Sequence, residues 1–230
     1  MLTKYYESYW EKRLKSKSDE PIPSGIPDFF KKFTSYGAIL NQIDQCENLL
    51  DIGCGDGKVA ELYKQKAKNV FGIDISAQAL EVAEKRGIKV AIQDLNDMPL
   101  KFPDDFFDYV ILTDVVEHVI NPIGLLKEVK RILKKDGRAI ITVPNFARLS
   151  NRLRMIFIGD PVDILHWSKY GDEVEHLHWF TLPKLKNLLL KEVRFFNLKP
   201  VPTGLKNLSF IFGLLGRYNL GSYLTIEIKK

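Results

Sequence analysis

The sequence predicts an α/β protein with a mostly parallel seven-stranded sheet and helices on both faces. Five short apolar runs lie between residues 47 and 144, and each ends in a polar or glycine-containing turn. Amphipathic helical patterns separate most of these runs. Strands buried on both faces are continuously apolar, and parallel strands need crossover connections, so this alternation is typical of a parallel sheet between two helical layers.

The five expected strands read ENLLDIG, KNVFGID, IKVAIQD, FDYVILTD and GRAIITVP. Helices are expected over KVAELYKQ, SAQALEVAEKRG and NPIGLLKEVKRILKKDG. Ser76 is placed to cap the second of these helices and Gly87 to end it. Asn121-Pro122 is placed to begin the third helix, and Asp136-Gly137 to end it.

The two ends of the chain complete a single predicted domain. Residues 1–45 form an N-terminal helical cap, with helical patterns at 1–17 and 28–43, and residues 46–145 form the central sheet. Residues 146–180 break the βα alternation and mix aromatic with charged residues, so we expect a mobile lid on the substrate side. Residues 181–230 supply a helix capped by Thr181 and two edge strands, VRFFNLKP and SYLTIEIKK, paired as an antiparallel hairpin.

Composition places the chain among ordinary globular proteins. It has 230 residues, of which 45% are hydrophobic and 27% charged, and a net charge of +5. The lysines and arginines are spread along the chain, which does not favour nucleic acid as a partner. The two cysteines, Cys46 and Cys54, suit a reducing compartment, and the polar N-terminus lacks a signal peptide pattern, so we predict a cytoplasmic protein without a transmembrane segment. Its oligomeric state and the role of the apolar stretch at 208–216 stay open.

Three glycines follow the first expected strand in LLDIGCGDG, at positions 53, 55 and 57. Lys58 stands where the dinucleotide pattern G-x-G-x-x-G needs glycine, and no Gly-Lys-Ser/Thr of a phosphate-binding loop follows. Asp51 precedes the turn and would repel a phosphate, but it suits a ligand with an ammonium group. The turn therefore indicates a close backbone approach to a ligand that carries no phosphate.

Two further acids end the next strands. Asp74 ends the second strand, where a carboxylate can accept hydrogen bonds from both hydroxyls of a ribose. Asp94 ends the third strand, where it can read an adenine amino group, although it also suits a simple turn. Together the three acids describe an adenosine with free ribose hydroxyls and an amino-acid tail, and S-adenosylmethionine fits this description.

Four segments closely resemble the successive motifs of class I S-adenosylmethionine-dependent methyltransferases. They are LLDIGCGDG, FGIDIS, VAIQDLNDMPLKFPDDFFDYVILTDVVEHVINP and LLKEVKRILKKDGRAIITVPN, in register over residues 47–145. Within this superfamily the chain looks most like the type 11 group and the MetW-like proteins of methionine biosynthesis. PNFARLSNRLRMIFIGDP and HLHWFT carry the weaker similarity beyond residue 145.

The resemblance implies roles for particular residues. Asp51, Gly53 and Gly55 would approach the methionine moiety, and Asp74 with Ile75 would hold ribose and adenine. The full set implied for the cofactor is Asp51, Gly53, Cys54, Gly55, Asp74, Ile75, Asp94, Leu95, Thr113, Asp114 and His118. Thr113 and Asp114 would sit beneath the sulfonium, and His118, the one candidate catalytic residue, would line the reaction side. The substrate-side candidates are Tyr5, Tyr9, Trp10, Asn145, His176 and His178.

No metal ion is predicted. The chain has no Cys-x-x-Cys or Cys/His cluster, which are the common metal-ligand patterns. His176 and His178 stand on either side of Leu177, so an extended segment would point both rings to one side. This pair leaves a metal site open, but it lacks an obvious third ligand.

Three functions stay open at this point. The first is methyl transfer to a small molecule or glycan on oxygen, nitrogen or carbon. The second is a MetW-like accessory protein that binds S-adenosylmethionine but serves as the partner of another enzyme. The third is methylation of protein or nucleic acid, against which stands the absence of an Asn/Asp-Pro-Pro-Tyr/Phe motif at the fourth strand, where the sequence reads LTDVVEH.

Overall fold

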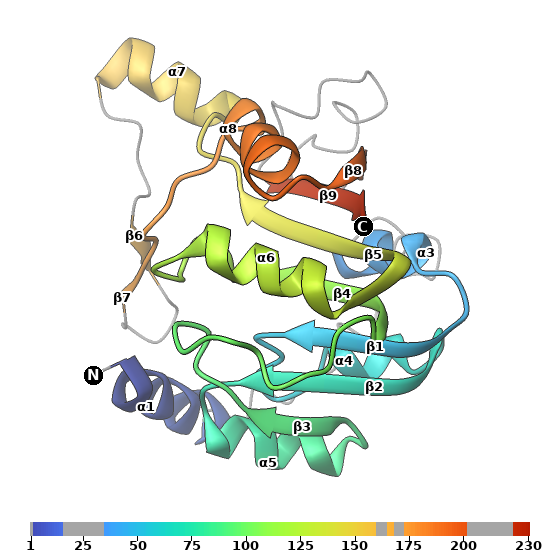
Figure 1. Ribbon diagram of the computed structural model, residues 1–230. Helices are drawn as coiled ribbons and strands as arrows, with labels where there is room; N and C mark the ends of the chain where they lie inside the picture. Colours follow the sequence, from blue (N-terminus) through green and yellow to red (C-terminus); the bar gives the residue numbers. More distant parts are fainter. Residues whose placement is uncertain (1, 16–34, 160–164, 168–172, 202–222) are drawn as a thin grey trace.

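A computed structural model describes residues 2–15, 35–159, 165–167, 173–201 and 223–230. A seven-stranded sheet forms its centre, with the strand order β3-β2-β1-β4-β5-β9-β8 (Figure 1). The strands are β1 (Cys46–Ile52), β2 (Ala67–Asp74), β3 (Lys89–Ile92), β4 (Phe107–Thr113), β5 (Leu133–Pro144), β8 (Phe196–Val201) and β9 (Tyr223–Lys229). The first five pair in parallel, which confirms the predicted α/β class and mostly parallel sheet.

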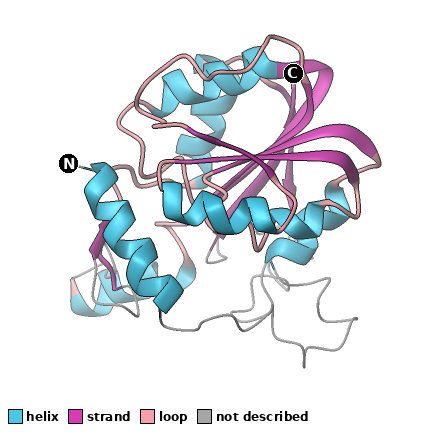
Figure 2. Cartoon of the chain, turned by 90° about the horizontal axis from the view of Figure 1, so that it is seen from below, coloured by secondary structure: helices cyan, strands magenta, loops and turns pink. Residues whose placement is uncertain are grey.

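Helices cover both faces of this twisted sheet, as Figure 2 shows from below. They are α1 (Leu2–Lys15), α3 (Ser35–Gln42), α4 (Ala60–Tyr63), α5 (Ala77–Lys85), α6 (Pro122–Ile132), α7 (Leu149–Ile158), α8 (Leu182–Asn187) and a π-helical turn, Leu188–Glu192. A separate two-stranded pair joins β6 (Leu165–Trp167) to β7 (Glu173–Glu175). None of the described helices has the length and apolar character needed to span a bilayer.

The predicted helix caps are present. Ser76 Oγ accepts a hydrogen bond from the Ala79 amide at 3.3 Å, and Asn121 Oδ1 accepts one from the Gly124 amide at 2.9 Å. Thr181 Oγ1 accepts the Lys184 amide at 3.4 Å. Each cap satisfies an amide that has no partner inside its own helix, so these residues fix where the helices begin.

Strand β9 is antiparallel to both of its neighbours, β5 and β8. The predicted antiparallel pairing of the two closing strands is therefore correct, and β8 takes the sheet edge. Residues 202–222 connect them and lie outside the described residues, as does the apolar stretch at 208–216. The first part of the predicted helix at 28–43 also lies outside them, and its second part forms α3.

Two apolar cores lie on opposite faces of the sheet. Neighbouring strand residues face opposite cores: Leu49 joins one of them and Leu50 joins the other. The first core packs against α3, α4 and α5 through buried residues that include Ile39, Tyr63 and Leu80. The second packs against α6, α8 and the π-helical turn. Burial on both faces explains why the strands read as continuous apolar runs.

The boundary between α6 and β5 differs from the prediction. The helix ends at Ile132, and β5 begins at Leu133, which pairs with Phe107 of β4. Asp136 and Gly137 therefore lie inside β5, next to a shift in the register with β4, and do not end a helix. A side chain at Gly137 would stand 2.8 Å from the Lys134 carbonyl and 3.0 Å from that of Phe107. The Asp-Gly pair serves a bulge here, and a bulge and a helix end use the same residue types.

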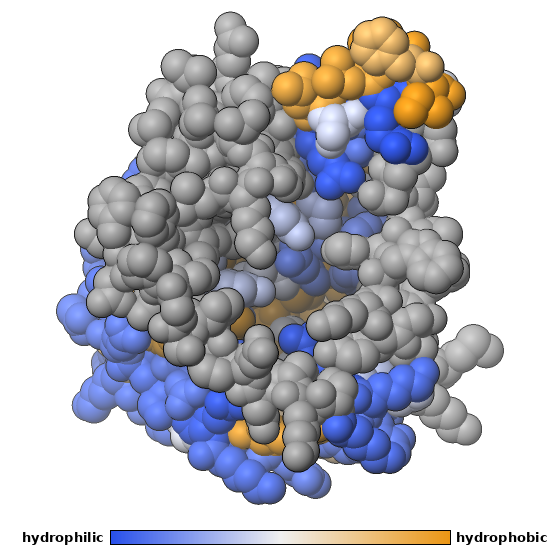
Figure 3. Space-filling model, turned by 180° about the vertical axis from the view of Figure 1, so that it is seen from behind, coloured by the Kyte–Doolittle hydropathy of each residue, from blue (hydrophilic) through white to orange (hydrophobic). Residues whose placement is uncertain are grey.

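Helix α7 exposes apolar side chains at its C-terminal end. The exposed residues are Leu153, Met155, Ile156, Phe157 and Ile158. Figure 3 shows apolar surface of this kind gathered at one corner of the molecule. The helix buries Asn151 instead, whose side-chain amide donates to the Phe146 carbonyl at 2.9 Å. Polar contacts, and not an apolar stripe, therefore attach this helix near its start.

Gly57 provides a test of how tightly the glycine turn packs. Its φ is 73°, and a Cβ there would lie 2.7 Å from Ala83 Cβ and 2.8 Å from Ala83 Cα in α5. Gly159 has nearly the same φ, 75°, with nothing within 4 Å. We expect Gly159→Ala to lower the free energy of unfolding by about 1 kcal/mol, the cost of the left-handed backbone. Gly57→Ala should cost about 1–3 kcal/mol more, because of overpacking.

Urea denaturation of the two variants and the unchanged protein measures this difference. Because the backbone term is common to both variants, their difference isolates the contact with α5. Equal losses of stability in the two variants would show that the turn and α5 separate at no cost.

Candidate functional site

The candidate site lies at the carboxyl ends of the parallel strands. Strand β1 has β2 on one side and β4 on the other, so the order of strands reverses here. Figure 1 shows α1 and the β6–β7 pair at the same edge of the sheet. Ligands of open α/β sheets bind at such a reversal point. The predicted residues at the ends of β1, β2 and β4 are therefore brought to one place.

The glycine turn after β1 is held against β2 by its backbone. The amides of Gly53 and Cys54 both donate to the Ile73 carbonyl, at 2.8 and 3.1 Å. Gly53 has a φ of 73°, and a Cβ there would lie 2.7 Å from Val115 Cγ2. Gly53 is exposed, whereas the Cys54 thiol is buried and lies beside Gly72, where an added Cβ would come within 2.6 Å of its sulfur. Cys54 therefore reaches the site only through its backbone.

The Asp74 carboxylate connects the glycine turn to α5. One oxygen accepts the Gly55 amide at 3.0 Å, and the other accepts the Ser76 amide at 3.0 Å. Asp74 is buried, and burial raises the pKa of its carboxyl, opposed by these backbone hydrogen bonds. Each oxygen keeps a further lone pair. Asp74 can therefore organise the turn and still accept a ligand hydroxyl.

Asp51 is a buried acid without a cationic partner. Only 4% of its surface is exposed, and no ion pair within the described residues includes it. Burial, followed by the nearby charge of Asp74, raises the pKa of Asp51 to about 8. A cationic ligand group at this point would reverse that shift. This acid therefore suits the ammonium group that its position before the glycine turn predicts for it.

Helix α1 packs directly on the glycine turn. The Trp10 ring is buried, and a Cβ at Gly55 would come within 2.3 Å of it. Glu7 accepts the Ala77 amide at 2.9 Å and the Ser76 hydroxyl at 3.3 Å, which ties α1 to the start of α5. The ring of Tyr9 stands edge-on to that of Trp10, with 5.6 Å between the ring centroids. Trp10 and Tyr9 are thus placed beside the predicted cofactor residues, whereas the side chain of Tyr5 lies outside what the structure describes.

The end of β4 carries the next group of predicted residues. Thr113 is half-buried. Asp114 is exposed on the surface and has a left-handed φ of 54°. The surrounding protein desolvates the Asp114 carboxyl and raises its pKa to about 7. Its negative charge in turn raises the pKa values of Tyr36 and Tyr223, after the larger effect of their burial.

The turn after β3 contains Asp94 and Leu95. Asp94 Oδ1 accepts the Asn96 amide at 2.8 Å, and Asn96 Oδ1 accepts the Ile120 amide at 2.8 Å. Leu95 is half-buried and packs against one of the cores. These contacts tie the turn after β3 to the loop after β4. Asp94 therefore makes the contact of a turn residue, which is one of its two predicted roles. Its other role, at the adenine, stays a prediction.

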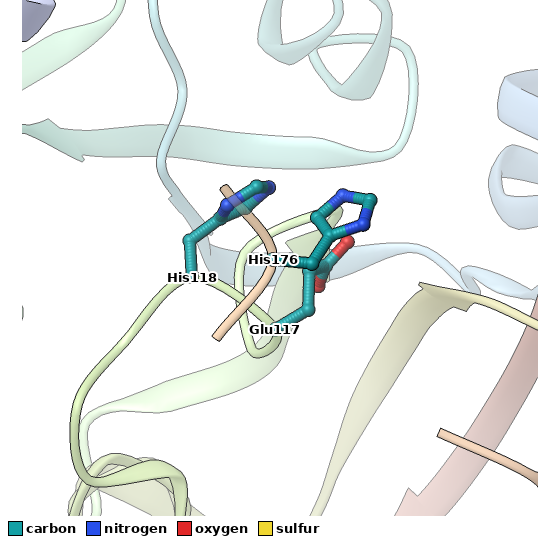
Figure 4. Close-up of side chains that lie close together, drawn as sticks. All are labelled: Glu117, His118 and His176. Atoms are coloured by element: carbon teal, nitrogen blue, oxygen red, sulfur yellow. The ribbon is translucent and has the colours of Figure 1, made fainter. Parts of the chain in front are cut away.

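Glu117, His118 and His176 come together beside the end of β4 (Figure 4). The rings of His118 and His176 lie 4.8 Å apart, measured between centroids. The amides of Leu177 and His178 donate to the Glu117 carbonyl at 2.9 and 3.1 Å. The segment that carries His176 is therefore hydrogen-bonded to the loop that carries Glu117.

His178 and Asn145 support this arrangement. His178 Nε2 lies 3.0 Å from the Val119 carbonyl, so both histidines face the loop after β4, as their spacing predicted. Asn145 is buried, forms a parallel bridge with Phe180, and accepts the Ala147 amide at 3.0 Å. Both ends of the predicted lid are thus bonded to the sheet side of the site, and its opening stays a prediction.

Three residues of the site were not among the candidates. They are Glu117, Tyr36 and Tyr223. Glu117 could have been recognised, because it interrupts the apolar run VVEHV beside Asp114 and His118. The two tyrosines come from α3 and β9, and only the tertiary fold brings them to Asp114.

Comparison with known proteins shows the family. A family model described as "Methyltransferase domain" matches residues 11–193. A solved S-adenosylmethionine-dependent methyltransferase of Thermotoga maritima has the same fold, with a TM-score of 0.66 and 22% identity over 96% of this chain and 99% of that one. The chain belongs to the class I S-adenosylmethionine-dependent methyltransferases, and its cofactor is S-adenosylmethionine.

Curated relatives give a finer comparison. An uncharacterised protein of Methanocaldococcus jannaschii is 31% identical over 184 residues, which cover 79% of this chain and 81% of that protein. A ubiquinone biosynthesis O-methyltransferase of Actinobacillus pleuropneumoniae is 25% identical over 67% of this chain and 71% of its own length. The bifunctional MetXA/MetW protein of Rhodopirellula baltica is 35% identical over 120 residues, which are 48% of this chain and 19% of that protein. The MetW-like resemblance is thus confirmed.

Asp51→Asn should separate two effects of this acid: the free energy that its burial costs the folded protein, and its contribution to cofactor binding. The unfolded chain has an ordinary aspartate pKa, and the folded chain holds the proton until about pH 8. The proton's contribution to stability is therefore complete below the ordinary aspartate pKa and is lost as the pH rises through about 8. We expect the variant to gain stability over the unchanged protein by more than about 1 kcal/mol between pH 5 and pH 8.

Urea denaturation at both pH values measures this gain, and any fixed cost of the amide cancels between them. Calorimetry should show binding of S-adenosylhomocysteine weakened by roughly tenfold or more, because a charge-assisted contact is lost. A stability difference that is the same at both pH values would mean that Asp51 is ionised in the free protein.

Proposed function

We propose that the chain transfers the methyl group of S-adenosylmethionine to a hydroxyl oxygen of a small organic acceptor. The observation that carries the proposal is the group of polar side chains beside the end of β4. Asp114, Glu117 and Tyr223 influence one another electrostatically, and His118 and His176 lie against Glu117. Such groups can hold a hydroxyl and accept its proton.

The cofactor supplies an electrophilic methyl group on a sulfonium sulfur. In this proposal Asp51 holds the ammonium group, Asp74 holds the ribose, and Asp94 with Leu95 flanks the adenine. Thr113 and Asp114 stand beside the sulfonium, and His118 stands on the acceptor side. Alignment and exclusion of water can supply about 7–11 kcal/mol of the barrier reduction. Helix α1, with Trp10 on the glycine turn, and residues 146–180 are the proposed cover.

Two observations support a small acceptor bound through oxygen. Above about pH 7 the exposed Asp114 carboxylate would repel the phosphates of a nucleic acid, whose binding depends on basic residues. The O-methyltransferase among the relatives acts, by its name, on oxygen. A cytoplasmic location belongs to the same proposal and rests on the sequence alone.

A second candidate is a MetW-like accessory protein that binds the cofactor and serves another enzyme. The identity of 35% with the MetXA/MetW protein favours it. It predicts cofactor binding without turnover of small acceptors.

An acceptor screen tests the proposal. The protein is incubated with S-adenosylmethionine and panels of small alcohols and phenols, amines, RNA and protein, and S-adenosylhomocysteine formation is measured. We expect product with hydroxylated small molecules, and mass spectrometry should place the methyl group on oxygen. Transfer to RNA or protein alone would contradict the proposal, and binding without any turnover would favour the accessory role.

Asp74→Ala tests the assignment of the ribose. The loss of a charged acceptor should weaken S-adenosylhomocysteine binding by roughly tenfold or more. The Gly55 and Ser76 amides also lose their acceptor, so the free energy of unfolding should fall by about 1–3 kcal/mol. An alanine at this position is therefore also expected to lower the melting temperature.

Ser76→Ala is the matched control. It removes the cap of α5 and should cost about 1 kcal/mol, yet it leaves the carboxylate in place. Denaturation and calorimetry on both variants, at a temperature where each is folded, separate the two effects. Equal affinities in the two variants would show that Asp74 only supports the fold.

A further inference from the structure

Glu117, His118 and His176 form a compact set of ligand-type atoms (Figure 4). One carboxylate oxygen and one ring nitrogen from each histidine all lie within 4.8 Å of one another. The first two residues follow β4, and the third comes from the segment after β7. The set therefore joins two parts of the chain that are far apart in sequence.

The carboxylate of Glu117 is the buried polar group of this set that lacks a hydrogen-bond partner among the described residues. Only 1% of its surface is exposed, and neither carboxylate oxygen has a hydrogen-bond partner within the described ranges. A buried polar group without a partner costs free energy, and a buried charge costs more. A cation between this carboxylate and the two imidazoles would remove that cost.

The backbone positions the histidine that comes from the distant segment. The amides of Leu177 and His178 donate to the Glu117 carbonyl, and His178 Nε2 bonds with the Val119 carbonyl. These contacts place His176 next to Glu117 through main-chain geometry. A site built on fixed backbone is the kind that can hold an ion with defined geometry.

We propose that Glu117, His118 and His176 bind one divalent transition-metal ion, of which Zn²⁺ is the best example. One carboxylate and two imidazoles are a donor set of catalytic zinc sites, whereas Mg²⁺ and Ca²⁺ favour oxygen ligands. Ligand atoms about 2.0–2.2 Å from a tetrahedral ion lie roughly 3.3–3.5 Å apart. The site would contract from its present spread of up to 4.8 Å, which rotation of the two half-buried histidine side chains allows.

Three protein ligands leave a position open on the ion. The set stands beside Asp114 on the acceptor side, so an oxygen of the acceptor can fill that position. This role rests on the proposed function. As a ligand, His118 would act on the acceptor hydroxyl through the ion, which polarises an oxygen bound to it. The sequence predicts no metal ion, because His176 and His178 lack an obvious third ligand. The structure instead pairs His176 with His118 and adds Glu117.

Titration of the chelator-treated protein with Zn²⁺ and with Co²⁺ tests the inference. We expect one ion per chain by calorimetry, and a visible Co²⁺ spectrum of low coordination number. Glu117→Gln and His176→Gln should each weaken Zn²⁺ binding by more than the roughly 10–100-fold that loss of an outer partner costs. His178→Gln is the control for the loss of an outer contact: it removes the ring that bonds to the Val119 carbonyl but no ligand of the ion, so it should weaken Zn²⁺ binding by no more than roughly 10–100-fold.

S-adenosylhomocysteine binding, measured on every variant, reports that the fold and the cofactor site are intact. Absence of Zn²⁺ binding at micromolar concentration, or equal binding by the unchanged protein and Glu117→Gln, would overturn the metal site and leave the proposed function standing. One bound Zn²⁺, lost in both ligand variants, supports the site even when no hydroxylated acceptor is turned over. In that last case the proposed function alone fails.

Discussion

The site depends on one carboxylate, that of Asp74, which bonds to two segments at once. It accepts the Gly55 amide from the turn after β1 and the Ser76 amide at the start of α5. Glu7 of α1 meets α5 at the same place, and Trp10 lies on Gly55. Charge-assisted hydrogen bonds to backbone amides are among the stronger ones. The glycine turn, helix α1 and the start of α5 are therefore all held together around the Asp74 carboxylate.

The acids of the site cost the free protein electrostatic free energy. Asp51, Asp114 and Glu117 are all desolvated, and the pKa of each carboxyl is raised. Desolvated acids that lie close together are typical of functional sites, because a like charge nearby makes each harder to ionise. A cationic cofactor group at Asp51 and a metal ion at Glu117 would each relieve part of that repulsion. The free protein is thus prepared for positively charged ligands at two neighbouring points.

Much of the fold and part of the site could be predicted from sequence, for physical reasons. Strands buried on both faces are apolar throughout, so the runs ending at Ile52, Asp74 and Thr113 were visible, and caps such as Ser76 are local signals. The ambiguity at Asp136-Gly137 was not resolvable, because a bulge and a helix end need the same residues. Tyr36 comes near Asp114, and His176 comes near Glu117, only through the tertiary fold, and no local pattern records that Glu117 meets a histidine from beyond β7. The roles of the predicted residues remain proposals.

The order of strands in the sheet has a consequence for how the protein is made. Strand β9 follows β8 in the chain but lies between β5 and β8 in the sheet. While a ribosome is still producing the chain, β8 emerges before β9. Strand β8 therefore has no neighbour in the sheet with which to pair until β9 follows. Strands β1 to β5 pair with one another without β9, so this part of the sheet can assemble first. Completion of the sheet must wait for β9, and until then the outer edge of β5 stays open to mispairing or to a chaperone.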